Sequence, residues 1–219
     1  MNINKQVKTL AIYLIPIVIA GVIKIYIAPP DLTPFNADEA IVALMARHIN
    51  QGNIPVFFYG QSYMGSLDAI LVGIGFKVFG ECVWVIRLVQ SLLYFGTIMT
   101  AMMLAFRLLD SKRAVLYTGL IMAIPPVNVT LYSTVSLGGY GEMLLVGNLL
   151  LLGGLSIIKQ INTDEFKMDW KLIVGLLTWS IGAGFAFWIF GLTLVYSLPV
   201  LLVIFWSLFK KAPEKIIVA

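Results

Sequence analysis

Charged side chains are scarce in this chain of 219 residues. Asp, Glu, Lys and Arg together make up 12% of the sequence, against about 25% in a typical soluble domain. Hydrophobic residues make up 60%, and the mean hydropathy is +0.94. This composition predicts an integral membrane protein in contact with a lipid bilayer. The net charge of +4 is small and gives no indication of nucleic-acid binding.

Cysteine and histidine are nearly absent. The single cysteine, Cys82, excludes an internal disulfide framework and a cysteine-rich metal site. The single histidine, His48, lies on the apolar face of a predicted helix, where a packing role is simpler than metal ligation. A hard divalent cation, which prefers oxygen ligands, is therefore the one cofactor that the sequence suggests, with Asp38 as its candidate ligand.

Long apolar runs take up most of the remaining sequence. A membrane-spanning helix needs about 20 mostly apolar residues. The runs predict an all-α, polytopic helix bundle of about six spans, forming a single membrane domain over residues 1–219. The third span contains Pro125 and Pro126, and we expect it to bend or end there. The predicted spans are residues 9–27, 83–108, 114–131, 140–158, 172–188 and 190–208.

Basic residues are unevenly distributed between the two sides of these spans. Cytoplasmic loops of membrane proteins are enriched in Lys and Arg. Eleven basic residues fall on the side of the two termini, and four fall on the other side. The distribution predicts that both termini are cytoplasmic and that the long loop, residues 29–82, is extracytoplasmic. The four basic residues on the outer side are Lys24, Arg47, Lys77 and Arg87.

The long outer loop is predicted to be structured. Apolar residues spaced three and four apart predict two amphipathic helices, over residues 38–51 and 66–79. Gly52 and Gly80 follow these helices as their expected stops. Such helices lie in the membrane interface, and together with the segment between them they could roof a cavity. The apolar face of the second helix comprises Leu67, Ile70, Leu71, Ile74 and Val78.

Two adjacent carboxylates, Asp38 and Glu39, begin the first of these helices. Asn36 can cap the helix, and Glu39 can complete a capping box with it. This structural role leaves Asp38 unexplained. The helix dipole favours the ionised form of Asp38. An ionised carboxylate that faces a cavity could accept a proton from an attacking hydroxyl, or hold a divalent cation.

Two more charged residues lie where predicted spans begin. Glu142 is either a boundary residue that reaches water or part of one site with Asp38. Arg87 lies about one turn inside its span, where it either extends to the interface or pairs with an acid or a phosphate. The segment between the loop helices supplies interfacial residues that would also suit contact with a sugar or a lipid phosphate. These residues are Tyr59, Gln61 and Tyr63.

Four short motifs occur in a fixed order around the acidic pair. They are residues 35–40 (FNADEA), 52–55 (GNIP), 59–66 (YGQSYMGS) and 87–88 (RL). Their order and spacing resemble the first outer loop of the GT-C integral-membrane glycosyltransferases. The resemblance is to the bacterial branch of protein-mannosyltransferase-like and aminoarabinose-transferase-like enzymes. It is most specific over about residues 35–95, although the Lys-Pro-Pro element of the aminoarabinose branch is absent.

The resemblance implies an enzyme of the bacterial inner or plasma membrane. It would transfer a sugar from a polyprenyl-phosphate-linked donor to a glycan, lipid or protein acceptor on the outer face. Asp38 matches the catalytic acid of the family with Glu39 as its partner, and Glu142 matches the second acidic site loosely. Arg87 matches the basic residue that opens the second helix. Family members are longer, so the resemblance also implies that a partner chain would supply a missing C-terminal part.

Two other functions remain compatible with the sequence. A non-catalytic, truncated family member would act as a scaffold or bind the lipid carrier through Arg87 without turnover. A small transporter would need broken helices and charged residues at mid-depth in the membrane. Pro125 and Pro126 could break a helix, but no predicted span carries a charge at mid-depth, so a transporter ranks last.

Overall fold

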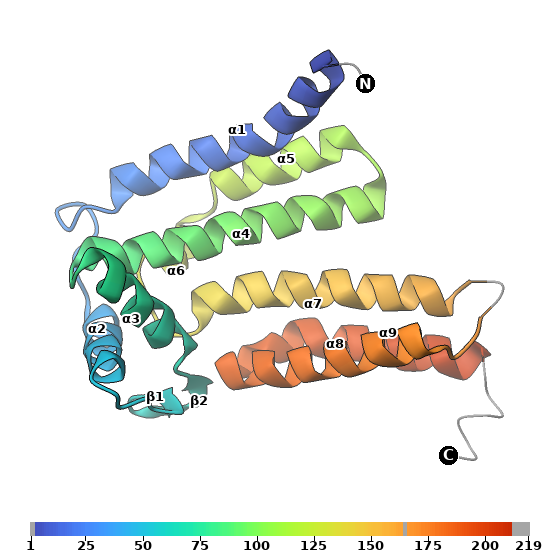
Figure 1. The fold of residues 1–219 in the computed structure, drawn as a ribbon. Coiled ribbons are helices and arrows are strands. Elements are labelled where there is room, and N and C mark those ends of the chain that lie inside the picture. Colours follow the sequence, from blue (N-terminus) through green and yellow to red (C-terminus); the bar gives the residue numbers. More distant parts are fainter. Residues whose placement is uncertain (1–2, 164–165, 212–219) are drawn as a thin grey trace.

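The computed structural model describes residues 3–163 and 166–211, which are mostly helical (Figure 1). In this described part, four helical segments are long and apolar enough to cross a membrane: α4, α7, α8 and residues 191–211. An all-α membrane protein is therefore confirmed, whereas the count of about six spans is not. The elements are α1 (Ile3–Ile27), α2 (Ala37–Asn50), β1 (Phe57–Phe58), β2 (Gln61–Gly65), α3 (Leu67–Phe79), α4 (Val83–Leu109), α5 (Lys112–Ala123), α6 (Val127–Tyr132), α7 (Tyr140–Ile161), α8 (Trp170–Ile189), η1 (Gly191–Thr193) and α9 (Leu194–Lys211).

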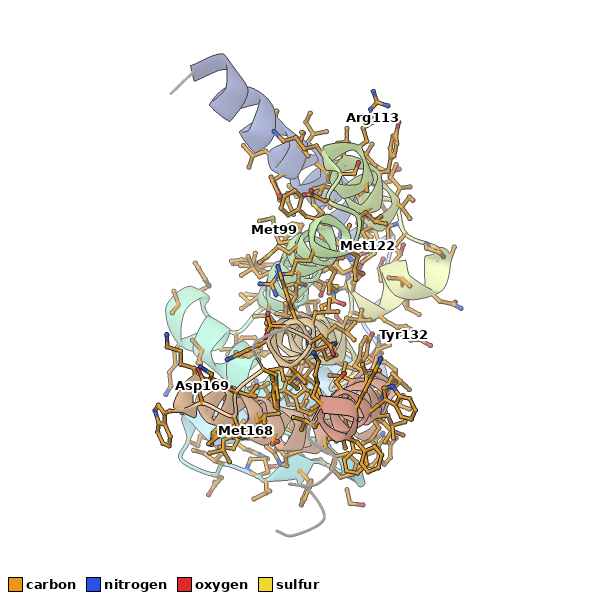
Figure 2. The ribbon with its side chains drawn as sticks, turned by 90° about the vertical axis from the view of Figure 1, so that its right-hand side faces the viewer. Met99, Arg113, Met122, Tyr132, Met168 and Asp169 are labelled. Atoms are coloured by element: carbon orange, nitrogen blue, oxygen red, sulfur yellow. The ribbon has the colours of Figure 1, made fainter. Side chains whose placement is uncertain are left out.

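The long helices form two layers. Helices α1, α4 and α5 pack together in one layer, α7, α8 and α9 form the other, and α4 packs on α7 where the layers meet. In the end-on view, Arg113 lies in the first layer, and Met168 and Asp169 lie in the second (Figure 2). The remaining elements, α2, α3, α6 and the β1–β2 hairpin, gather at one end, which we call the capped end.

Each layer has its own apolar core. In the first layer, Tyr94, Ile98 and Met102 of α4 are buried against α1 and α5. In the second layer, glycines on one face of α7 let α9 approach closely. A Cβ atom at Gly147 would lie 2.6 Å from the ring of Tyr196. Small residues at such crossings are typical of helix packing in membranes, because they allow close backbone approach.

The third predicted span is not one helix. Residues 112–123 form α5, and a separate short helix, α6, begins at Val127. Pro125 and Pro126 lie between the two helices, as expected, because proline lacks an N–H donor and restricts the residue before it. α6 projects from one side of the helix stack (Figure 2), and the segment after it, residues 133–139, turns back into the protein interior.

The two helices of the long loop are confirmed as α2 and α3. Gly52 and Gly80 follow them in the left-handed region, with φ angles of 96° and 86°. The loop also contains the short β1–β2 hairpin, which the sequence pattern did not predict. The face of α3 that was predicted to be apolar is not the face that packs against the rest of the protein. Ile74 and Val78 are exposed along an apolar groove between α3 and α4, and the other face of α3 is buried.

Candidate functional site

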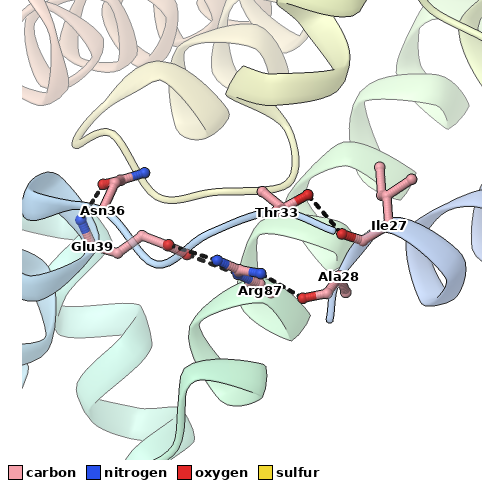
Figure 3. Close-up of polar contacts among 6 residues, drawn as sticks. All are labelled: Ile27, Ala28, Thr33, Asn36, Glu39 and Arg87. Atoms are coloured by element: carbon pink, nitrogen blue, oxygen red, sulfur yellow. Dashed lines mark hydrogen bonds and ion pairs between the residues drawn. The ribbon is translucent and has the colours of Figure 1, made fainter. Parts of the chain in front are cut away.

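Two polar residues, Asn36 and Glu39, fix the start of α2 through different contacts. The Oδ1 atom of Asn36 accepts a hydrogen bond from the backbone N–H of Glu39 at 2.9 Å, so Asn36 caps the helix as expected. Glu39 does not complete a capping box. Its two carboxylate oxygens accept hydrogen bonds from Nε and Nη2 of Arg87, at 3.0 and 2.8 Å (Figure 3). The buried guanidinium of Arg87 outcompetes the backbone N–H of Asn36 because an ion pair inside the protein is poorly screened.

Arg87 is buried together with Glu39. Their side chains are 1% and 0% exposed, and Nη1 of Arg87 donates to the backbone oxygen of Ala28 (Figure 3). Arg87 therefore pairs with an acid, which is one of the two alternatives that the sequence left open. The contacts join three elements at the capped end: the end of α1, the start of α2 and the start of α4.

Asp38 remains at the surface of the same helix turn and is only partly buried. The charge of Asp38 acts on the phenol of Tyr140, the first residue of α7, and Tyr63 and Tyr132 lie within electrostatic range of the same phenol. Tyr140 stacks on Tyr132 with ring centroids 4.8 Å apart and meets the ring of Phe190 edge-on at the same distance. We call Tyr63, Tyr132, Tyr140 and Phe190 the aromatic cluster.

The other candidates from the hairpin segment have different partners. The hydroxyl of Tyr59 lies 2.9 Å from Nδ1 of His48 in α2, so the histidine is a packed, hydrogen-bonded residue. Gln61 lies in β2 and is partly buried. Tyr63 is 59% exposed, and its ring centroid lies 6.1 Å from that of Phe190. Of the three, Tyr63 is the one that joins the aromatic cluster.

Glu142 is brought to a residue that the sequence analysis did not identify. Its carboxyl group is 1% exposed and lies within hydrogen-bonding reach of the Asp68 carboxyl group in α3. Nε2 of Gln90 donates to Oδ1 of Asp68 at 2.7 Å, and the Ser136 hydroxyl donates to Oδ2. Burial raises the pKa of Asp68 to about 6, and the charge of the neighbouring Glu39 also raises this pKa.

Lys24 is a second buried cation at the capped end. Its ammonium group donates to the backbone oxygen and hydroxyl of Ser133, both at 2.6 Å, and to the hydroxyl of Thr134 at 2.8 Å. It also lies 4.8 Å from the centroid of the Tyr94 ring. Lys24 therefore connects α1 through hydrogen bonds to the buried segment that follows α6, residues 133–139. The adjacent hydroxyl residues Ser133 and Thr134, in an otherwise apolar part of the sequence, were the one signal that could have predicted a polar contact here.

A groove of about 470 Å³ runs between α1 and α4 and contains both buried cations in its lining. Most of its remaining surface is apolar, and Ser91 adds one hydroxyl. A groove that is mostly apolar and has two basic residues in its lining matches a molecule that has a hydrocarbon chain and an anionic group. The lining residues are Gly21, Lys24, Ile25, Ala28, Pro29, Pro30, Trp84, Arg87, Leu88, Ser91 and Phe95.

Among the described residues, the acids do not form a metal site with three or more His, Cys, Asp or Glu ligands, because no three such side chains lie close enough together to hold a metal ion. Asp38, the candidate ligand from sequence, lies beside aromatic rings rather than within the buried acids. No protein-family model, no curated protein and no solved structure matches this chain. The chemistry of the site is therefore inferred from its own residues.

Proposed function

We propose that this protein is a membrane glycosyltransferase module that acts at the capped end, on the extracytoplasmic side that the Lys and Arg distribution predicts. The observation that carries the proposal is the contrast between two adjacent acids. Both oxygens of Glu39 are held by Arg87, whereas no hydrogen bond or ion pair within the described residues engages the carboxylate of Asp38. Asp38 is thus free to act on a substrate beside the aromatic cluster.

In the proposed reaction, Asp38 acts as the general base. A hydroxyl of the acceptor attacks the anomeric carbon of the donor sugar and passes its proton to the carboxylate of Asp38. The bond between that carbon and the phosphate oxygen breaks, and the polyprenyl phosphate leaves as the anion. Asp38 lies in the first turn of α2, where the helix dipole favours a negative charge. The exposed ring of Tyr63 next to Tyr140 offers an aromatic surface for a sugar ring.

The groove between α1 and α4 supports a donor of this kind. A guanidinium group has five N–H donors. Arg87 uses two of them on Glu39 and one on the oxygen of Ala28, which leaves two for the oxygens of a phosphate. The apolar walls of the groove would hold the isoprenoid chain, and Lys24 contributes a second positive charge.

The same groove favours a second candidate function. Phosphate binding in the groove does not require Asp38, so a protein that only binds the lipid carrier would show the same groove. The two functions differ in turnover. A binder retains the polyprenyl phosphate without cleaving the sugar bond, whereas a transferase releases it.

The test is sugar transfer from a radiolabelled panel of polyprenyl-phosphate sugars by the purified 219-residue chain in lipid nanodiscs. We expect transfer by the native chain and its loss in Asp38→Asn, with donor binding retained. Asp31→Asn is a matched control, since Asp31 is an exposed acid in the neighbouring loop. Equal transfer by Asp38→Asn would contradict the role of Asp38. Donor binding without transfer by any variant would favour the lipid-carrier binder.

A further inference from the structure

Three oxygen atoms in the buried acid cluster have no donor within the part of the chain that the structure describes. They are Oε1 and Oε2 of Glu142 and the amide oxygen Oε1 of Gln90. Both side chains are 1% exposed, so bulk water does not solvate them. A buried polar oxygen without a partner costs about 1–3 kcal/mol, and a charged one costs more. Three such atoms in an otherwise well-bonded region indicate that something else completes the cluster.

The hydrogen bonds around Asp68 show that both of its carboxylate oxygens already have a donor. Gln90 donates to one carboxylate oxygen of Asp68 through Nε2, and Ser136 donates to the other. These contacts fix the orientation of the Gln90 amide, so that its nitrogen faces Asp68 and its oxygen is left over. A methyl group at Gly141, the residue before Glu142, would collide with this oxygen. The leftover oxygen therefore lies against the first turn of α7, the turn that carries Glu142.

A shared proton does not complete the cluster. If Glu142 were protonated, its hydroxyl could donate to Asp68, which would satisfy one of its two oxygens. The other oxygen of Glu142 and the amide oxygen of Gln90 would still lack a donor. A cation, in contrast, can contact all three oxygens together with one from Asp68, since each carboxylate oxygen has a second lone pair.

We propose that Asp68, Gln90 and Glu142 form a binding site for a hard divalent cation such as Ca²⁺ or Mg²⁺. The ligand set is two carboxylates and one amide oxygen, the ligand types that these ions prefer, with water completing the coordination. Ser136 and the Gln90 nitrogen act as outer partners that orient Asp68. The site does not use Asp38, so it stands independently of the proposed sugar transfer.

The charges around the site favour a cation. Two acids face each other, and Glu39, whose charge also acts on Asp68, is already paired with Arg87. Asp68 is 1% exposed, and its hydrogen-bond donors among the described residues, Gln90 and Ser136, are both uncharged, so this carboxylate has no counter-charge there. A divalent ion would supply that charge and would join α3, α4 and α7, the three helices that contribute its ligands.

The experiment titrates Mn²⁺ into the EDTA-treated chain in nanodiscs and counts bound ions by electron paramagnetic resonance. We expect one buried Mn²⁺ per chain, displaced by Ca²⁺ or Mg²⁺, and a rise in the thermal unfolding midpoint when Ca²⁺ is added. Glu142→Gln and Gln90→Met should each weaken Mn²⁺ binding at least tenfold and remove the thermal shift. Asp38→Asn should bind as the native chain does.

Several results would overturn the site. One is a folded native chain that binds no Mn²⁺, which would mean that water or a proton completes the cluster. Another is Mn²⁺ binding that Glu142→Gln leaves unchanged. A third is binding that is lost in Asp38→Asn but kept in Glu142→Gln, which would place the ion at the start of α2. If a variant does not fold, the Mn²⁺ titration of the native chain and the displacement of Mn²⁺ by Ca²⁺ still test whether the site exists.

Discussion

Glu39 and Arg87, 48 positions apart in the sequence, form a buried bidentate ion pair that joins α2 to α4. The pair fixes the start of α2 against the end of the first long helix layer. It also separates the roles of two neighbouring acids, because Glu39 is enclosed while Asp38 stays at the surface. The position of Asp38 beside Tyr140 therefore depends on a contact that Asp38 does not itself make.

Removing the cation of this pair should destabilise the protein strongly. Arg87→Met leaves Glu39 buried without a partner, and breaking a buried pair in this way costs about 3–5 kcal/mol. Thermal unfolding in detergent measures the loss, and the double variant Glu39→Gln/Arg87→Met should lose less than Arg87→Met alone. Arg47→Met is the control, because Arg47 pairs with Glu81 at an exposed site and should have a much smaller effect. Equal losses of stability in Arg87→Met and Arg47→Met would contradict the prediction.

Removing Lys24 should also destabilise the fold. Lys24→Met deletes the donor for the backbone oxygen of Ser133 and for the hydroxyls of Ser133 and Thr134. Leaving buried acceptors unsatisfied should lower the free energy of unfolding by about 1–3 kcal/mol. Lys77→Met changes an exposed lysine at the same end and serves as the control. A native-like melting curve for Lys24→Met would show that the contact is energetically neutral.

The aromatic cluster should contribute to substrate binding more than to turnover. We expect Tyr140→Leu to raise the KM for the sugar donor about two- to tenfold, because an aromatic contact is worth about 0.5–1.5 kcal/mol. The value of kcat should change less, since Asp38 is still present. Tyr117→Leu, at an exposed position of α5, is the control. A fall in kcat with KM unchanged would assign Tyr140 to the chemical step instead.

Stability of the cation-free protein should depend on the ionisation of Asp68. The folded state raises the pKa of this buried carboxyl group to about 6, from an ordinary value of 3.8. Between these values the folded state holds more protons than the unfolded state, so stability falls as the pH rises from about 4 through about 6. Melting curves of the EDTA-treated chain test this. Glu142 faces Asp68 and titrates together with it, so the double variant Asp68→Asn/Glu142→Gln should flatten the slope while Asp31→Asn should not. A slope that persists in the double variant would assign the titration to another group.

Adding a side chain where α7 meets α9 should separate the two helices. In Gly147→Ala the new methyl group would lie 2.6 Å from the Tyr196 ring, and overpacking of this kind costs about 1–3 kcal/mol. Gly184→Ala is the matched control on α8, since no atom lies within 4 Å of its added Cβ. Thermal unfolding should show a lower midpoint for Gly147→Ala alone. If both variants melt like the native chain, α7 and α9 are less closely packed than this contact implies.

Local pattern predicted much of the helical framework. Runs of apolar residues identified α4, α7, α8 and the last helical segment as long enough to span a membrane. Gly52 and Gly80 correctly marked the ends of the two loop helices, and Pro125 with Pro126 marked the break after α5. These features depend on residues within a few positions of each other, so sequence spacing alone is enough to predict them.

The partners of the charged residues could not be predicted in the same way. The sequence showed Glu142 as an unusual acid, but its neighbour Asp68 is 74 positions away and looked like an ordinary helix residue. Lys24 meets Ser133 across 109 positions. Nothing in the local pattern predicted that residues 133–139 would turn inward and supply hydroxyl groups to two different charged residues.

By itself, the sequence determined that the chain is a helical membrane protein, where most of its helices begin and end, and that Asp38 and Glu39 open a helix outside the long spans. Hydrophobicity and helix periodicity act locally, and they need no knowledge of the rest of the fold. The tertiary structure alone decided that Glu39 is enclosed while Asp38 is only partly buried, and that Asp68, Gln90 and Glu142 meet. A buried charge takes whichever partner the packing of distant helices places within reach, because leaving it unpaired costs more than any local preference can offset.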